Sequence, residues 1–243
     1  MTRSNSPRKL VGVVLAGGRG TRLFGPQGGP KCLFNVNERP LLDYSLSAIR
    51  NAGVDEIALV AREDDLELQS KYSDLALIPD TGNGTFFAIL AAAEYAVGKR
   101  SDAIISSCDL VCAPTAAKAL VDSSFKDPDW LATFGVTLIA NDQNPIWVHT
   151  DRSGRILNYG KEIQASEYAF ASIRYATFSF LEAVIESAKT ATSDINTDTK
   201  LMRYLMLSKG VIAGAIDIGR ALDVDDDADA KIAEDISRSF RWT

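Results

Sequence analysis

Cysteine and histidine are scarce in this sequence, which has only Cys32, Cys108, Cys112 and a single histidine, His149. An odd, small number of cysteines at these spacings is not a disulfide framework. A metal site built from Cys108, Cys112 and His149 would need a fourth ligand that the sequence does not supply. We therefore expect the cysteines to be small residues of the core.

Long apolar runs and an excess of positive charge are also missing. No run approaches the roughly 18 residues of a membrane span. Residues 10–16 are too short for a signal-peptide core, and glycines and an arginine follow them. The net charge of −6 argues against a nucleic-acid-binding surface, which usually has a basic excess. We expect a cytoplasmic protein that binds neither membranes nor nucleic acids.

The size and patterning of the chain fit one large domain. Its 243 residues suffice for a full core. Residues 1–9 are polar and are predicted to be flexible. The remainder shows no repeat, linker or low-complexity stretch, so residues 10–243 are predicted to form a single domain.

Strand and helix patterns alternate over the first 110 residues, which predicts a mostly parallel sheet with helices on both faces. Strands are predicted at 11–16, 56–61, 75–79 and 102–108, and helices at 40–53, 64–72 and 86–97. Strands also follow at 130–140, 145–151, 155–161, 168–177, 210–218 and 221–224, and helices at 178–189, 198–210 and 226–240. The predicted fold is α/β: a single Rossmann-like domain with a mixed, mostly parallel sheet and a β-hairpin insertion turning at 151–154. In such sheets ligands bind outside the carboxyl ends of the strands.

The first predicted strand runs directly into a glycine-rich, cationic segment. Three glycines and three cations follow it within 15 residues: Gly17, Gly18, Arg19, Gly20, Arg22 and Lys31. Glycines let backbone N–H groups approach an anion, and the cations neutralise phosphate oxygens. The segment lacks the Lys-Ser/Thr pair of a P-loop and the third glycine of a dinucleotide fingerprint. It therefore indicates a polyphosphate site of another kind.

The strings "LAGGRGTRL", "GGPK" and "ERPLLDYSLSAIRNAGVDEIALV" resemble the nucleotidyltransferases that activate phosphorylated sugars and alcohols. The chain departs from that pattern at "FGPQGG" and at Cys32. The resemblance implies that Lys31 contacts the reacting phosphate and that Arg22 acts with it in catalysis. It also implies a nucleotide-binding loop composed of Leu15, Ala16, Gly17, Gly18, Arg19, Gly20, Thr21 and Arg22.

A second glycine loop, Gly82-Asn83-Gly84-Thr85, stands between a predicted strand and a helix. A turn with a helix cap is one interpretation. In the resembled family this position contacts the nucleobase, and "GNG" resembles the inositol-1-phosphate cytidylyltransferase branch, with phosphocholine cytidylyltransferases close to it. CTP is therefore the favoured donor, while UTP, dTTP and GTP stay open.

Acidic residues recur at two predicted strand ends. Asp109 follows the strand at 102–108, and the string "DVDDDADA" starting at Asp223 resembles the family's closing "DVDTPEDL". The resemblance implies that Asp109, which also adjoins the nucleotide, shares an Mg²⁺ ion with Asp225; Asp223 is the alternative ligand. Because the carboxyl ends of parallel strands share one edge, we expect these carboxylates to lie close together.

On the acceptor side, "NYGKE" provides Lys161, and Arg174 lies on the strand that follows. The resemblance implies that Lys161 contacts the acceptor phosphate, although an exposed lysine without a function fits the sequence too. Arg174 is the second predicted acceptor contact.

The sequence thus predicts an Mg²⁺-dependent nucleotidyltransferase that joins an NMP unit, CMP by preference, to a small phosphorylated sugar, cyclitol or alcohol and releases pyrophosphate. Two alternatives stay open: a guanylyltransferase of a cofactor precursor and a non-catalytic subunit that binds sugar nucleotides. The expected partners are an NTP and a phosphorylated acceptor. The sequence is compatible with a homo-oligomer.

Overall fold

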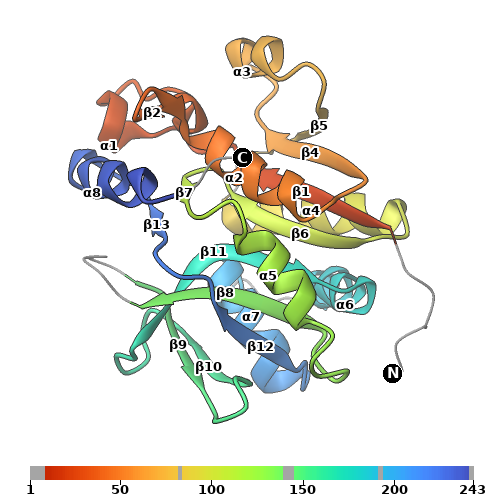
Figure 1. The fold of residues 1–243 in the computed structure, drawn as a ribbon. Helices are drawn as coiled ribbons and strands as arrows, with labels where there is room; N and C mark the ends of the chain where they lie inside the picture. The colour runs from red at the N-terminus through yellow and green to blue at the C-terminus, as the bar shows by residue number, and fades with distance from the viewer. Residues whose placement is uncertain (1–8, 82–83, 139–144, 191–193, 241–243) are drawn as a thin grey trace.

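The computed structural model describes residues 9–81, 84–138, 145–190 and 194–240 (Figure 1). Within these ranges a nine-stranded sheet lies between helices. The strands of the main sheet are β1 (Leu10–Leu15), β4 (Glu56–Ala61), β5 (Ala76–Pro79), β6 (Asp102–Ser107), β8 (Ala132–Leu138), β9 (Trp147–Thr150), β10 (Ile156–Gly160), β11 (Tyr168–Ala176) and β12 (Ala213–Asp217). Two small ladders pair β2 (Asn35–Val36) with β3 (Arg39–Pro40) and β7 (Leu110–Val111) with β13 (Leu222–Asp223). The helices are α1 (Thr21–Phe24), the 3₁₀ turn η1 (Lys31–Leu33), α2 (Leu41–Asn51), α3 (Leu66–Lys71), α4 (Thr85–Gly98), α5 (Ala116–Ser123), α6 (Phe178–Thr190), α7 (Asp198–Ser208) and α8 (Asp227–Arg238).

The first half of the sheet is parallel, as the alternating pattern predicted. β6, β1, β4 and β5 lie side by side in that order, and every pair among them is parallel. Successive side chains along a strand point to opposite faces of the sheet, and β1 is buried on both of its faces. Val11 and Val13 pack into one core cluster and Val14 into another. On the second face, a Cβ at Gly12 would lie 2.3 Å from Cγ2 of Ile49 in α2, so the helix and strand can approach this closely only with glycine there.

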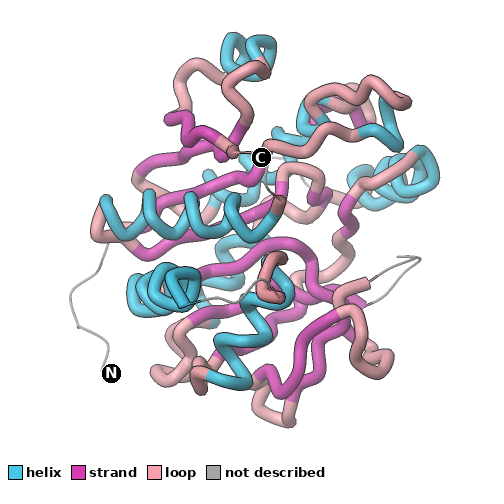
Figure 2. The backbone as a smooth tube through the Cα atoms, turned by 180° about the vertical axis from the view of Figure 1, so that it is seen from behind, coloured by secondary structure: helices cyan, strands magenta, loops and turns pink. Residues whose placement is uncertain are grey.

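Helices cover both faces of the sheet. The alanine-rich α4 packs with α6 and α7 in one layer, which lies in front of the sheet in Figure 2. On the other face α2 packs beside α5. The three cysteines are buried in the described structure, in agreement with the sequence prediction. Within the described residues no helix combines the length and apolarity needed to cross a bilayer.

The second half of the sheet is mixed. β11 runs antiparallel to β6, β8 and β9, while β12 runs parallel to β8. The predicted hairpin is present: β9 and β10 are antiparallel. The register of β11 against β8 shifts between Phe170 and Arg174, and Ser172 in this bulge has a positive φ of 48°. Such a conformation is unfavourable for a residue other than glycine, so the surrounding structure must impose it.

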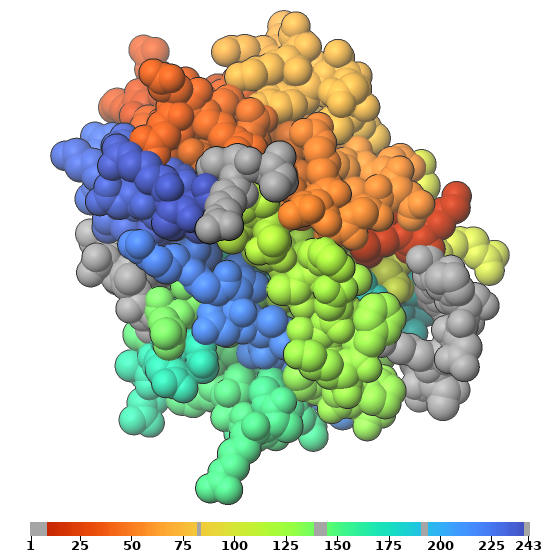
Figure 3. Space-filling view, viewed as in Figure 1, coloured from red at the N-terminus to blue at the C-terminus, as the bar shows by residue number. Residues whose placement is uncertain are grey.

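The C-terminal segment crosses back to the N-terminal part of the sheet. β13 pairs antiparallel with β7, and α8 packs on the β2 region, where Asn37 Nδ2 donates a 2.8 Å hydrogen bond to the carbonyl of Glu234. Figure 3 shows this C-terminal segment in blue against the red and orange N-terminal segments. The expectation that the strand around Asp223 ends at the edge of the parallel sheet is wrong. This strand lies outside the main sheet; its pairing with β7 and the 3.0 Å hydrogen bond from the Val224 N–H to the Asp109 carbonyl bring it to Asp109.

Candidate active site

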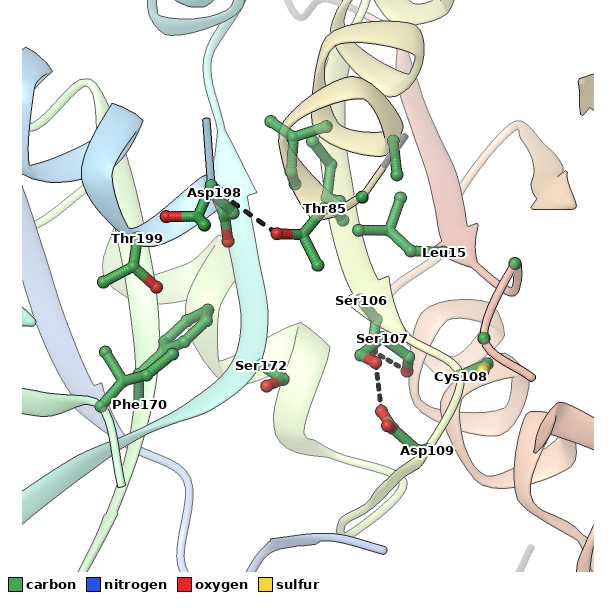
Figure 4. A pocket seen from close by; sticks show the side chains of 18 of the residues that line it. Leu15, Thr85, Ser106, Ser107, Cys108, Asp109, Phe170, Ser172, Asp198 and Thr199 are labelled. Carbon is green, nitrogen blue, oxygen red and sulfur yellow. Dashed lines mark hydrogen bonds between the residues drawn. The ribbon is translucent and has the colours of Figure 1, made fainter. Parts of the chain in front are cut away.

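A cavity of about 720 Å³ lies at the carboxyl ends of the parallel strands. β1, β4, β5 and β6 each contribute residues at or just after their last position: Leu15, Arg62, Asp80 and Ser107. The opposite wall comes from β10, β11 and α7, and Figure 4 shows Phe170, Ser172, Asp198 and Thr199 there, across from Leu15 and Thr85. The volume falls in the range of small-molecule sites.

The structure places most of the predicted nucleotide-loop residues at this cavity. Those that line it are Leu15, Gly17, Gly18, Arg19, Lys31, Gly84, Thr85 and Asp109. Ala16, Gly20, Thr21 and Arg22 do not line it; Ala16 is buried, and its N–H donates to the carbonyl of Val60. Gly82 and Asn83 lie outside the described residues.

Two glycines shape the loop for identifiable reasons. At Gly17 an added Cβ would lie 1.7 Å from Oδ2 of Asp80, so any other residue would require the Asp80 side chain to move. Gly20 has a φ of 56°, which glycine adopts without strain. The loop then folds back on itself, because the Lys31 N–H donates to the carbonyl of Gly18 at 3.0 Å. The side chain of Lys31 therefore begins next to the glycine turn.

Lys31 is the centre of the charged cluster. The residue is only 8% exposed, and its Nζ binds the carboxylate of Asp109 and, at 2.5 Å, Oδ1 of Asp225. Arg22 reaches Oδ2 of Asp225 at 2.9 Å. Burial lowers the pKa of Lys31, but attraction by Asp109 and Asp225 outweighs it and holds the pKa above its usual value. Burial raises the pKa of Asp225, but Lys31 and Arg22 more than compensate, and the net pKa is lowered. The lysine is thus held as a cation and Asp225 as an anion.

Asp223 lies beside this cluster. Ser172 donates a hydrogen bond to its Oδ2, while its Oδ1 is shielded from solvent and has no hydrogen-bond partner among the described residues. Burial and the nearby charge of Asp109 raise the pKa of Asp223 well above its usual value. On the other side, Ser107 donates to Asp109 (Figure 4). Two serine hydroxyls therefore orient two of the three carboxylates.

The carboxylates suit a divalent cation only in combination with a substrate. In the described part of the chain, no group of three or more His, Cys, Asp or Glu side chains is arranged to hold a metal ion. Asp109 and Asp225 nevertheless face one another across the Lys31 ammonium group. Two carboxylates with phosphate oxygens and water are the set that Mg²⁺ commonly takes.

The two predicted acceptor residues both line the cavity, and they differ in their surroundings. Lys161 is exposed at the end of β10. Arg174 is 3% exposed and forms a two-point ion pair with Asp198; its guanidinium carbon lies 5.0 Å and 4.9 Å from the ring centres of Phe134 and Phe170. The charge of Arg174 is therefore already matched, which makes direct contact with a substrate anion less favourable than at Lys161.

Sequence analysis missed several lining residues: Arg62, Asp80, Ser106, Ser107, Glu162, Ser172, Thr197, Asp198, Thr199, Lys200 and Arg203. Arg62 and Asp80 directly follow predicted strands, so the rule that ligands bind at strand ends could have found them. The residues of α7 gave no such signal, because only the packing of that helix brings its first turns to the cavity.

Comparison with known proteins agrees with this geometry. Residues 12–187 match the model of the MobA-like NTP transferase domain family. The CTP:phosphoglutamine cytidylyltransferase of Campylobacter jejuni is 24% identical over 211 residues, which cover 77% of this chain and 81% of that protein. A probable molybdenum cofactor guanylyltransferase of Thermococcus gammatolerans is 43% identical over 63 residues, or 26% of this chain and 31% of the relative. The chain thus matches less than a third of the length of that relative.

Solved structures share the fold. The inositol-1-phosphate CTP transferase from T. maritima superposes with a TM-score of 0.75 at 20% identity, covering 96% of this chain and 98% of that one. A putative glucose-1-phosphate thymidylyltransferase from Bacillus anthracis gives 0.78 at 14% identity, with 96% and 97% covered. These matches confirm the predicted fold class. Since the family model matches residues 12–187, most of the chain, and the glycine loop lies at the cavity, this chain belongs to the MobA-like NTP transferase family of nucleotidyltransferases.

Proposed function

We propose that this chain transfers CMP from CTP to a small phosphorylated sugar, cyclitol or alcohol, with Mg²⁺ as cofactor and pyrophosphate as the second product. The observation that carries the proposal is the contact of Lys31 with Asp109 and Asp225 beside the glycine loop. It gathers a cation and two carboxylates, from three distant segments, where a triphosphate would meet an acceptor.

The chemistry needs little beyond this arrangement. A phosphate monoester is already an anionic nucleophile, so no general base is required. Its oxygen attacks the α-phosphorus of the NTP, the bond from that phosphorus to the bridging oxygen breaks, and pyrophosphate leaves with the bond electrons. Lys31 stabilises the charge that develops on the phosphates, and the glycine loop holds them in line. Arg22, which does not line the cavity, acts in this proposal by holding Asp225.

The residues present fit a divalent cation. Asp109 and Asp225 offer carboxylate oxygens, and Asp223 has one oxygen without a partner in the described structure. We favour Asp109 with Asp225 as ligands and keep Asp223 as the alternative. When bound, Mg²⁺ would neutralise charge on the triphosphate.

CTP is the favoured donor because the cytidylyltransferase relative is similar over most of this chain, whereas the guanylyltransferase match covers about a quarter of it. The higher identity of that shorter match supports GTP transfer to a cofactor precursor as the second candidate function. A non-catalytic role is disfavoured, since Lys31 and Asp109 are both present and in contact.

The test is pyrophosphate release from ATP, CTP, GTP, UTP and dTTP with Mg²⁺ and a panel of phosphorylated sugars, cyclitols and aminoalcohols. We expect turnover with CTP and one class of acceptor. Turnover confined to GTP and a molybdenum cofactor precursor would favour the second candidate. Nucleotide binding without pyrophosphate release from any pair would support the non-catalytic role.

A further inference from the structure

The wall opposite the glycine loop carries an excess of positive charge. We define the acceptor wall as the lining residues of β10, β11, α7 and the adjoining segments: Gly160, Lys161, Glu162, Phe170, Ser172, Arg174, Thr197, Asp198, Thr199, Lys200 and Arg203. It has four cations and two carboxylates. Asp198 pairs with Arg174, and Glu162 lies 3.7 Å from Arg203. Lys161 and Lys200 make no ion pair with a carboxylate among the described residues.

This charge balance limits the acceptor. The two remaining positive charges match the phosphate dianion of a monoester at neutral pH. Both carboxylates of the described wall are already paired with arginine, so neither is free to neutralise a positive group on the acceptor, such as a quaternary ammonium group. An acceptor whose body is neutral needs no such partner.

The aromatic content of the acceptor wall also argues against an acceptor with a quaternary ammonium group. Recognition of a quaternary ammonium group uses the open faces of several aromatic rings. Within the described part of the lining, Phe170 is the single aromatic residue. Its ring already packs on the Arg174 guanidinium and lies 5.6 Å from the ring of Tyr159. The described lining therefore provides no aromatic cage.

Hydrogen-bonding groups surround the same space. Figure 4 shows Thr85, Ser172 and Thr199 around it, together with Asp198. Asp198 is held on two sides: its carboxylate by the buried Arg174 and its backbone N–H by Oγ1 of Thr85 at 3.2 Å. Each oxygen of a carboxylate paired with arginine keeps a further lone pair that can accept a hydrogen bond from an alcohol. Arg174 therefore fixes the orientation of the Asp198 carboxylate, which can accept hydrogen bonds from substrate hydroxyls.

From these observations we infer that the acceptor is the monophosphate of a neutral, hydroxyl-rich alcohol, a sugar or cyclitol, and that Asp198 determines this specificity by accepting its hydroxyl hydrogen bonds. The inference rests on the proposed function and narrows its acceptor class. Phosphocholine, which the sequence left open, is excluded.

Calorimetry on the full chain without metal measures acceptor binding apart from turnover. We expect myo-inositol 1-phosphate or glucose 1-phosphate to bind at least about 10-fold more tightly than phosphocholine or phosphoethanolamine, because polar sites discriminate strongly against ligands that leave them unpaired. Equal or tighter binding of an aminoalcohol phosphate, or of phosphoglutamine, overturns the inference while leaving nucleotidyl transfer intact. Absence of pyrophosphate release with every pair would instead overturn the proposed function.

Asp198→Asn tests the residue itself. It should weaken polyol phosphate binding about 10-fold and leave CTP and phosphocholine binding unchanged. Asp122→Asn, on the exposed face of α5 and outside the cavity, is the matched control. A uniform loss for all ligands, or none, overturns the role of Asp198. If Asp198→Asn fails to fold because Arg174 loses its partner, Thr199→Val removes a wall hydroxyl without changing charge, and it should weaken polyol phosphates alone.

Discussion

The two walls of the cavity are built in different ways. On the nucleotide side, parallel strands end together and each delivers its last residue or the next one to the site, as Leu15, Asp80 and Ser107 show. On the acceptor side, antiparallel β11 needs a bulge at Ser172, and α7 needs the ion pair between Arg174 and Asp198. The first wall follows from local sequence and a general rule about sheets. The second depends on pairwise contacts between distant segments, which makes it the better place for specificity to differ among relatives.

The largest effect is expected on the nucleotide side. Lys31→Ala should lower turnover by about 10²–10³-fold, because the developing phosphate charge loses its nearest cation. Pyrophosphate release measures it. Lys118→Ala, which removes an exposed lysine paired with Asp122 on α5, is the matched control and should leave turnover unchanged. Near-normal turnover of the Lys31 variant would remove this residue from the mechanism.

Metal binding by the Lys31→Ala variant tests the nucleotide side of the cavity without a measurement of turnover. In the structure the Lys31 ammonium group lies between Asp109 and Asp225, where it competes with any other cation. Without nucleotide, Lys31→Ala should therefore bind Mn²⁺ more tightly than the native chain. Electron paramagnetic resonance of free Mn²⁺ measures this. Weaker binding by the variant would contradict the competition.

The next largest effect on turnover is expected at the carboxylates of Asp109 and Asp225. Asp109→Asn and Asp225→Asn should each lower turnover roughly 100-fold and raise the Mg²⁺ concentration required, since charge neutralisation at a metal site is worth several kcal/mol. Because Lys31 binds both carboxylates, each change should also cause a modest loss of folding stability. Asp223→Asn should lower turnover less. If Asp223→Asn proves more damaging than Asp225→Asn, the assignment of the second ligand is reversed.

The second glycine loop should affect specificity more than rate. Asn83 lies outside the described residues, so its role stays a prediction from the sequence. If its amide contacts the nucleobase, Asn83→Ala should change relative kcat/KM among NTPs by roughly 10-fold. Steady-state kinetics with all five NTPs measures this. An equal fall for every NTP would mean that the loop is structural.

The smallest effect is expected at the bulge of β11. Ser172→Ala keeps the unfavourable backbone conformation and removes the hydrogen bond to Asp223, which should cost about 1–2 kcal/mol of unfolding free energy. Ser172→Gly removes the same bond and relieves backbone strain of about 1 kcal/mol or more, so it should be the more stable of the two. Urea unfolding of both variants separates the cost of the lost hydrogen bond from the gain due to relief of backbone strain. Equal stabilities would show that the positive φ stores no strain.

The sequence by itself determined the parallel half of the fold and the position of the glycine loop. Apolar runs predicted β1, β4, β5 and β6 to within about one residue. Burial on both faces accounts for the continuous apolar runs of β1, β4 and β6, whereas β5 lies at the edge of the sheet and is partly exposed. Gly17, Gly18 and Lys31 could be named because conformational freedom and charge are properties of the residues themselves. Chain order along a parallel sheet then places them at one edge.

Only the tertiary structure decided how the acids and the acceptor wall come together. Asp223 reaches Asp109 through the β7–β13 ladder, a pairing of two-residue strands too short to leave a periodic signal. The burial of Arg174 against Phe134 and Phe170, and its pairing with Asp198, depend on how α7 packs across the sheet. The physical reason is range: turn and strand preferences act over a few residues, whereas a buried charge acquires its partner only when distant segments exclude water together.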